Sequence, residues 1–185
     1  MVDNMKIITL NWRDIQFLTL NLARKIIESN FIPDIIVGVA RGGWVTARLL
    51  SDLLNVKNLA SMKIEFYKSI GKRNGKPVIT QPISESPYGK SVLIVDDVAD
   101  TGESLLLAKN HVDSMGAKEI KLATLHMKPW SKIAPDFYVE LTDAWIIYPW
   151  EFRESIEYLT EILKDEEKLL SIGIPKEYME FLKKR

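Results

Sequence analysis

Carboxylate and hydroxyl side chains are concentrated in residues 92–105, which read VLIVDDVADTGESL. An apolar run ends at Val95, Asp96 and Asp97 follow it, and the sequence DTGES at 100–104 precedes a helical pattern. In open α/β sheets, ligands bind beyond the carboxyl ends of strands, where the chain turns into a helix. The first turn of such a helix has free backbone N–H groups and the positive end of the dipole, so this segment predicts a phosphate site.

The residue types of this segment suit different parts of a phosphorylated sugar. Gly102 lets the backbone approach an anion, and the hydroxyls of Thr101 and Ser104 can donate to it. Asp96 and Asp97 would repel a phosphate, but they can accept hydrogen bonds from sugar hydroxyls or contact Mg2+ through water. A ligand with a phosphate, a ribose diol and a metal ion therefore fits the whole segment.

A second candidate anion site lies upstream, in the sequence GVARGGWV at 38–45. Ala40, Arg41, Gly42 and Gly43 follow an apolar run and precede a helical pattern, so their backbone amides can face an anion while Arg41 adds a charge. A Gly-Gly pair after a strand is often only a turn. Its position one strand–helix unit before the main segment is what favours a binding role.

The elements around these two segments predict an α/β fold with a central parallel sheet flanked by helices. The spacing of apolar residues predicts helices over 11–28, 44–54 and 103–115, and strands over 35–40, 60–66, 91–95, 118–125 and 144–147. Residues 67–89 are predicted to form a long irregular connection. Residues 154–185 are charged, with Leu and Ile at helical spacing, and predict two helices that are separated near Gly173 and Pro175.

Composition excludes several classes of protein. The 185 residues carry 25 basic and 25 acidic side chains, so no net charge favours nucleic acid or a membrane surface. The absence of cysteine excludes disulfides and thiol catalysis, and it favours the cytoplasm. Because no apolar run approaches the roughly 18 residues of a membrane helix, we expect a soluble protein.

The segment IVDDVADTGES resembles the phosphoribosyl-pyrophosphate signature of the type I phosphoribosyltransferases, in which an apolar strand, two acidic residues and two spacers precede D-T-G-x-[ST]. The resemblance implies that Asp100 accepts or donates a proton near N7 of a purine, and that Ala40–Gly43 bind pyrophosphate. It implies a phosphoribosyl and 5'-phosphate site formed by Asp96, Asp97, Val98, Ala99, Asp100, Thr101, Gly102, Glu103 and Ser104. Glu103 departs from the family, which often has Gly or Lys there, and its carboxylate must point away from the phosphate.

The resemblance also implies a purine site. Lys128 follows an apolar segment, where purine-handling members of the family have a lysine that donates to O6; a solvated lysine at a strand end is the alternative reading. Lysine only donates, so it suits a 6-oxopurine and not the amino group of adenine. By the same resemblance, Trp145 stacks on the purine in a small hood and Ile146 offers its carbonyl, although a tryptophan among apolar residues is often simply core. Asp97 and Glu151 are the candidate Mg2+ contacts, and Glu151 could equally be a surface carboxylate.

The predicted function is therefore purine salvage: a Mg2+-dependent transfer of a phosphoribosyl group from 5-phosphoribosyl 1-pyrophosphate to guanine, hypoxanthine or xanthine. The alternatives are a transferase for adenine or a pyrimidine, and a non-catalytic sensor of the activated sugar. We expect a transferase domain with its hood over 1–151, a helical extension over 152–185 packed on it, and a homodimer or homotetramer. Lys72 and Arg73 are candidates to cover the leaving pyrophosphate.

Overall fold

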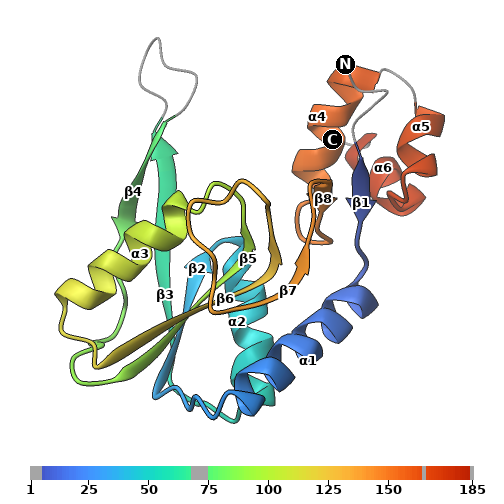
Figure 1. Ribbon diagram of the computed structural model, residues 1–185. Helices are drawn as coiled ribbons and strands as arrows, with labels where there is room; N and C mark the ends of the chain where they lie inside the picture. Colours follow the sequence, from blue (N-terminus) through green and yellow to red (C-terminus); the bar gives the residue numbers. More distant parts are fainter. Residues whose placement is uncertain (1–5, 68–74, 164–165, 184–185) are drawn as a thin grey trace. The chain divides into compact units, whose positions relative to one another are not determined.

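The computed structural model describes residues 6–67, 75–163 and 166–183 (Figure 1). The chain divides into two compact units. Gln16–Thr142 form one of them, called the sheet unit below, and Met1–Ile15 with Asp143–Arg185 form the other, called the terminal unit. Residues 143–151, which we expected in the transferase domain, thus share a compact unit with the C-terminal helices. The helical extension over 152–185 packed on the transferase domain stays a prediction.

The sheet unit contains a six-stranded sheet in the order β4-β3-β2-β5-β6-β7 among the described residues. The strands are β2 (Ile35–Ala40), β3 (Leu59–Tyr67), β4 (Lys76–Gln81), β5 (Ser91–Ala99), β6 (Glu119–Met127) and β7 (Phe137–Leu141). All neighbouring pairs are parallel except β3 and β4, which are antiparallel. Both faces of β2 and β5 are buried, as continuous apolar runs in a parallel sheet predict. The predicted fold class is confirmed.

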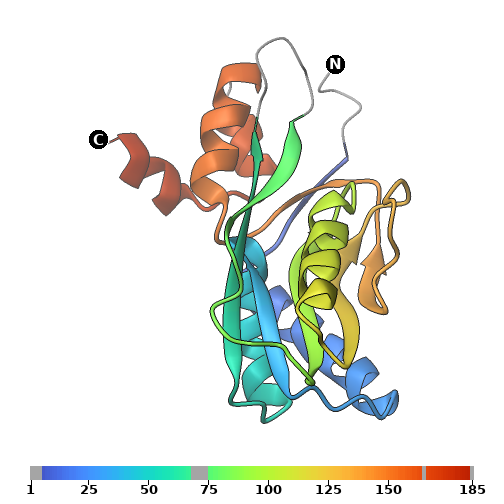
Figure 2. The same ribbon diagram turned by 90° about the vertical axis from the view of Figure 1, so that its left-hand side faces the viewer.

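Helices cover both faces of this sheet. The connection from β2 to β3 contains α2 (Gly42–Leu53), and the connection from β5 to β6 contains α3 (Glu103–Ser114). These helices lie on opposite faces (Figure 2), because right-handed connections leave β2 and β5 in opposite directions along the sheet. The core between the sheet and α3 includes Val37, Ile94 and Leu105. Both helices begin at the carboxyl ends of their strands, where the two candidate anion sites were predicted.

Helix α1 (Trp12–Glu28) begins in the terminal unit and continues into the sheet unit. Asn11 caps it, since its Oδ1 accepts from the backbone N–H groups of Arg13 and Asp14 at 2.9 and 3.1 Å. The apolar face of this helix is buried and contains Ile15, Leu18, Leu22 and Ile26.

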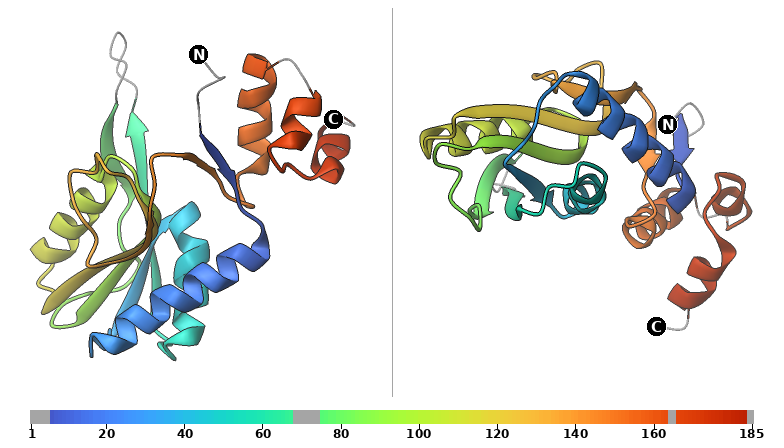
Figure 3. Two further views of the ribbon diagram at one scale, coloured as in Figure 1. Left: turned by 45° about the vertical axis from the view of Figure 1, so that its right-hand side comes forward. Right: turned by 90° about the horizontal axis from the view of Figure 1, so that it is seen from below.

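The terminal unit pairs β1 (Ile7–Thr9) with β8 (Trp145–Ile147) in parallel and adds α4 (Phe152–Leu163), α5 (Glu166–Ser171) and α6 (Lys176–Lys183) (Figure 3). Its small core contains Ile147, Phe152, Ile156, Leu159, Leu169, Ile174 and Met179. Helix α4 ends at Leu163 and α5 begins at Glu166, and residues 164–165 lie outside the described residues, so the expectation of two C-terminal helices stays a prediction. The predicted break near Gly173 is confirmed, since Gly173 lies between α5 and α6 and has a φ of +93°.

Two sequence predictions in the sheet unit need correction. Part of the connection over 67–89 is the edge strand β4, and β7 was not predicted. The central strand also extends four residues beyond Val95, because Asp96, Val98 and Ala99 pair with β6. Asp96 and Asp97 consequently belong to the strand and not to a turn. No helix in the described part of the chain is both long and apolar enough to cross a membrane.

Candidate functional site

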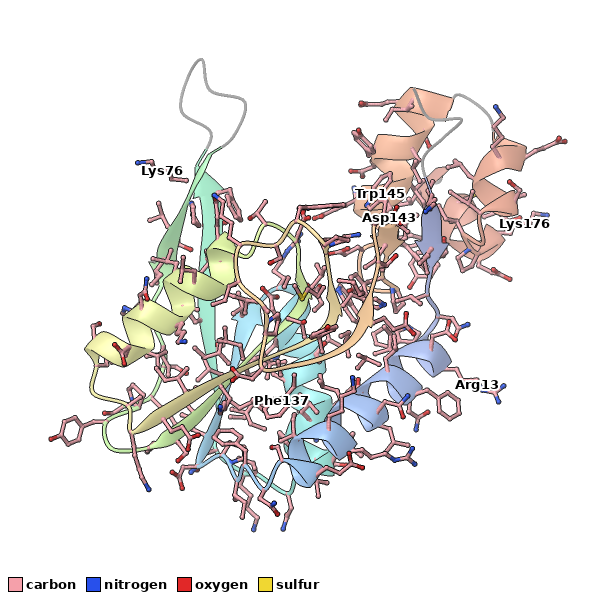
Figure 4. The ribbon with its side chains drawn as sticks, in the orientation of Figure 1. Arg13, Lys76, Phe137, Asp143, Trp145 and Lys176 are labelled. Atoms are coloured by element: carbon pink, nitrogen blue, oxygen red, sulfur yellow. The ribbon has the colours of Figure 1, made fainter. Side chains whose placement is uncertain are left out.

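A cavity of about 780 Å3 lies at the carboxyl end of β5, within the sheet unit. This volume is in the usual range for small-molecule sites, roughly 300–1,000 Å3. The nine predicted phosphoribosyl-site residues, Asp96 to Ser104, all line it. The sequence reasoning missed the other lining residues, which are Phe66, Gly75, Lys76, Leu105 and Lys132. Lys76 is the first residue of β4 and is exposed (Figure 4), so the start of the edge strand also borders the cavity.

Backbone contacts orient the two adjacent carboxylates. Oδ1 of Asp96 accepts the N–H of Asp97 at 3.0 Å, and Oδ1 of Asp97 accepts the N–H of Val98 at 2.8 Å. Asp97 is buried, whereas Asp96 is half-buried. Each side chain is thus held beside its own strand, where it borders the cavity as an acceptor of hydrogen bonds.

Gly102 is required by the shape of the turn. Its φ is +78°, and an added Cβ would lie 2.7 Å from Ser131 Oγ and 2.8 Å from Ile133 Cγ2. A side chain at this position would therefore clash with residues 131–133 and strain the backbone. Gly102 directly precedes α3 and brings no capping side chain to it, which leaves the helix N-terminus to an anion in the cavity.

Lys132 explains how a glutamate is tolerated at position 103. Its Nζ donates to Glu103 Oε1, and its backbone N–H donates to the carbonyl of Thr101 at 3.0 Å. The carboxylate that departs from the family pattern is thus paired with a cation that also lines the cavity. The pair offsets the negative charge of Glu103 beside the proposed phosphate position.

The second predicted site begins where β2 ends. Ala40 and Arg41 line a hollow of about 420 Å3 together with Lys63, Ile64, Glu65 and Phe66, and Phe66 also borders the main cavity. The peptide bond between Ala40 and Arg41 is cis. Gly42 and Gly43 belong to the first turn of α2, which begins two residues earlier than predicted. An added Cβ at Gly43 would lie 2.8 Å from Asp96 Oδ1, so the two predicted anion sites are in direct contact.

Lys128, the predicted contact to the purine, directly follows β6. It is only 6% exposed, and therefore is not a solvated strand-end lysine. Its backbone N–H donates to the carbonyl of Ala99 at 3.0 Å, and its Nζ lies 5.7 Å from the centre of the Trp130 ring. Trp130 Nε1 in turn donates to Asp100 Oδ1 at 2.9 Å. Trp130, which the sequence did not indicate as a site residue, thus contacts both Lys128 and Asp100.

His126 is fully buried two residues before Lys128. Burial and, to a smaller extent, the positive charge of Lys128 lower the pKa of His126 from 6.5 to about 4. Glu140 Oε2 lies 3.5 Å from Nε2, and a carboxylate at this position favours a higher pKa. The Glu140 side chain is 54% exposed, however, so water screens its charge. His126 is therefore neutral near pH 7 and packs as an uncharged residue of β6.

The remaining predicted residues lie in the terminal unit. Trp145 is half-buried and its ring meets that of Tyr158 edge to face, with centroids 5.3 Å apart (Figure 4). Ile146 is buried in β8, paired with Ile8 of β1. Glu151 directly precedes α4. Lys72 and Arg73 lie outside the described residues.

The donor set at the end of β5 fits Mg2+. This ion usually keeps several waters and is bound through one or two carboxylates together with substrate phosphates. Asp96 and Asp97 offer two carboxylates at the wall of the cavity. Within the described ranges, no group of three or more acidic or histidine side chains encloses an ion site, so a metal ion here would need oxygens from the substrate.

Comparison with known proteins gives consistent results. Residues 10–156 match the family described as "Phosphoribosyl transferase domain". The chain is 27% identical to xanthine-guanine phosphoribosyltransferase of Idiomarina loihiensis, over 77% of this chain and 86% of that protein. The structure of purine phosphoribosyltransferase from Pyrococcus horikoshii is similar, with a TM-score of 0.71 and 44% identity over 79% of this chain and 94% of the other. A Neisseria gonorrhoeae protein solved with bound ppGpp has a TM-score of 0.72 and 26% identity, covering 80% and 90% of the two chains.

Proposed function

The chain belongs to the phosphoribosyltransferase family, and from this premise we propose that it transfers the phosphoribosyl group of 5-phosphoribosyl 1-pyrophosphate to a 6-oxopurine. The observation that carries the proposal is the single cavity lined by all nine residues from Asp96 to Ser104. The similar proteins named above, a xanthine-guanine and a purine phosphoribosyltransferase, support the choice of base.

In the proposed complex, the 5'-phosphate occupies the N-terminus of α3. Gly102 allows close approach there, the hydroxyls of Thr101 and Ser104 donate, and the helix dipole favours the negative charge. Lys132 adds a positive charge at the same wall of the cavity. Asp96 and Asp97 accept hydrogen bonds from the ribose diol, since their carboxylates are held beside the cavity by backbone N–H groups.

The pyrophosphate is proposed to lie against Ala40–Gly43. Arg41 supplies charge, and the first turn of α2 supplies backbone N–H groups at Gly42 and Gly43. Mg2+, when bound by the substrate oxygens near Asp97, adds positive charge that stabilises the departing pyrophosphate. Glu151 as a second contact to the ion stays a proposal that rests on the resemblance alone.

The chemical step forms the bond between purine N9 and ribose C1 and breaks the bond between C1 and the pyrophosphate oxygen. The purine loses one proton, and we assign Asp100 as its acceptor near N7. Lys128 is the proposed donor to O6, because a lysine ammonium only donates hydrogen bonds and the oxo group of a 6-oxopurine only accepts them. The stacking role of Trp145 and the carbonyl role of Ile146 also rest on the resemblance alone.

Base specificity tests the proposal against its alternatives. Guanine, hypoxanthine, xanthine, adenine, uracil and orotate would each be mixed with the activated sugar and Mg2+, and pyrophosphate release would be measured. We expect release with one or more of the three 6-oxopurines. Release only with adenine or a pyrimidine would favour a sister enzyme, and binding of the activated sugar without release with any base would favour a sensor. We further expect a cytoplasmic homodimer or homotetramer, and light scattering tests the assembly.

A further inference from the structure

The indole of Trp130 contacts both groups that the proposed reaction assigns to the purine. It donates to Asp100 Oδ1 at 2.9 Å, and Lys128 Nζ lies 5.7 Å from its ring centre. We infer that Trp130 is a positioning residue, which holds the Asp100 carboxylate in the orientation that accepts the purine proton. This inference rests on the proposed function, because it requires Asp100 to act on the base.

The backbone fixes the two side chains opposite each other. The carbonyls on both sides of Asp100, those of Ala99 and Thr101, each accept an N–H at 3.0 Å. The donors are Lys128 and Lys132, which lie two residues before and two residues after Trp130. Residues 128–132 thus run alongside residues 99–101, and a backbone hydrogen bond joins the two segments at each end. The Trp130 indole and the Asp100 carboxylate meet between these two hydrogen bonds.

The bond between Ser131 N and the carbonyl of Lys128, at 3.1 Å, closes the turn that carries Trp130. The close approach of Gly102 to Ser131 and Ile133 leaves the two segments little freedom to separate. The position of the indole is therefore set by the backbone around Asp100 and does not depend on a flexible surface loop.

Core packing does not explain Trp130. The residue is 56% exposed, so most of its ring is not buried by the fold. A large aromatic side chain that is exposed but directs its N–H at a carboxylate in the wall of a cavity is better explained by that hydrogen bond. Its replacement should accordingly leave the protein folded.

The hydrogen bond restricts how Asp100 presents its second oxygen. A carboxylate turns readily about its Cβ–Cγ bond when both oxygens face water. With Oδ1 held by a donor that the backbone fixes, the direction of Oδ2 is fixed as well. A general base needs such an orientation toward the proton that it accepts, and an error of about 1 Å in placing reacting groups can cost on the order of 100-fold in rate.

Two variants separate the N–H group from the ring. Trp130→Phe keeps an aromatic face near Lys128 and removes the donor, whereas Trp130→His restores a ring N–H. For Trp130→Phe we expect kcat to fall about 10- to 100-fold while KM for the base changes less than about threefold. Trp130→His should recover part of the lost kcat. Thermal unfolding of both variants provides the control for folding.

A double-variant cycle distinguishes this inference from the proposed function. Asp100→Asn alone should reduce kcat, and adding Trp130→Phe to it should cause little further loss, because the carboxylate to be oriented is already absent. Unchanged turnover in Asp100→Asn would remove the proposed role of Asp100 itself. If Asp100→Asn is slow, then unchanged kcat in Trp130→Phe, or an equal loss in both backgrounds, would overturn the positioning role alone. A lower KM for the base with unchanged kcat would also overturn it, and would show that the indole competes with the purine for Asp100.

Discussion

Gly43 leaves no space for a side chain against Asp96. An added Cβ would lie 2.6 Å from the carbonyl oxygen of Val95, 2.7 Å from Asp96 Cα and 2.8 Å from Asp96 Oδ1. Contacts this short involve backbone atoms of the central strand, which cannot move aside as the end of a flexible side chain can. The start of α2 and the end of β5 therefore approach as closely as they do because residue 43 has no Cβ, and this contact joins the proposed pyrophosphate and ribose sites.

We therefore expect Gly43→Ala to damage stability and ligand binding together. The overpacked contact should cost about 1–3 kcal/mol of unfolding free energy. Displacement of Asp96 should weaken the affinity for the activated sugar with Mg2+ at least about tenfold, which is about 1.4 kcal/mol. Calorimetric titration and denaturant unfolding measure the two effects.

Gly89→Asn is the matched control for Gly43→Ala. Gly89 has a φ of +68° with nothing within 4 Å of an added Cβ, and asparagine tolerates this conformation. The Gly89→Asn variant should lose less than about 1 kcal/mol of unfolding free energy and should bind the activated sugar normally. Normal binding by Gly43→Ala itself would mean that the contact does not shape the site.

The pair formed by Glu103 and Lys132 predicts a coupling at the proposed phosphate position in the cavity. Lys132→Met removes a cation and leaves the Glu103 carboxylate beside the phosphate, so affinity for the activated sugar should fall about tenfold. Glu103→Gln combined with Lys132→Met should regain most of this loss, because the unpaired carboxylate is then absent as well. Calorimetric titration of the two single variants and the double variant gives the coupling.

Lys109→Met controls for the change of net charge in that cycle, since Lys109 is an exposed residue of α3 that does not line the cavity. It should bind the activated sugar as the unmodified protein does. Additive effects of Glu103→Gln and Lys132→Met would show that the pair has no influence on phosphate binding.

Local sequence was sufficient to predict which residues at the end of β5 line the main cavity. Residues 96–104 form one continuous passage from strand to helix, and their order along the chain already determines their order along the cavity wall. The pattern could not give the length of β5, because Val98 and Ala99 extend the strand by pairing with His126 and Met127 in β6. Such pairing depends on a segment almost thirty residues away in the chain.

The contacts that surround Asp100 and Glu103 could not be predicted for the same reason. Trp130 and Lys132 contact Asp100 and Glu103 because the chain after β6 folds back onto residues 99–101. The local spacing of apolar residues does not predict this long-range contact. Strand β4 was missed because its six residues include Pro77 and only partly buried side chains. Proline is tolerated in edge strands, so a weak pattern of this kind is compatible with a strand at the border of the sheet.

The burial of Lys128 predicts a change in base preference. Glutamine offers both a donor and an acceptor, so Lys128→Gln should pair with O6 less strongly and accommodate an amino group better. We expect kcat/KM for guanine to fall about 10- to 100-fold, the effect of losing about 1–3 kcal/mol, and the ratio of adenine to guanine turnover to rise. The measurement is initial-rate kinetics with both bases.

Lys121→Gln is the control for Lys128→Gln, because Lys121 lies in β6, which Lys128 directly follows, but is paired with Asp136 and is not buried as Lys128 is. It should leave the ratio of adenine to guanine turnover unchanged. An unaltered ratio in Lys128→Gln would argue against contact between Lys128 and the base.

His126 predicts how the stability of the protein depends on pH. Its pKa is about 4 in the folded protein and near 6.5 in the unfolded chain, where neither burial nor Lys128 acts on it. Above pH 6.5 the imidazole is neutral in the folded and in the unfolded state, so it does not make the stability depend on pH. Between pH 6.5 and about 4, His126 binds a proton in the unfolded chain but not in the folded protein. The free energy of unfolding therefore falls as the pH is lowered through this range.

We expect His126→Leu to remove this dependence. At about 1.4 kcal/mol for each pKa unit, the protein should lose on the order of 3 kcal/mol of unfolding free energy between pH 7.5 and pH 4 through His126. The variant should lose correspondingly less over the same interval, as measured by urea unfolding at several pH values. Lys128→Met gives an independent check, because removing the nearby positive charge raises the pKa of His126 and should make the loss smaller but not abolish it. Equal pH dependence in the unmodified protein and in His126→Leu would show that other groups govern the acid sensitivity of the fold.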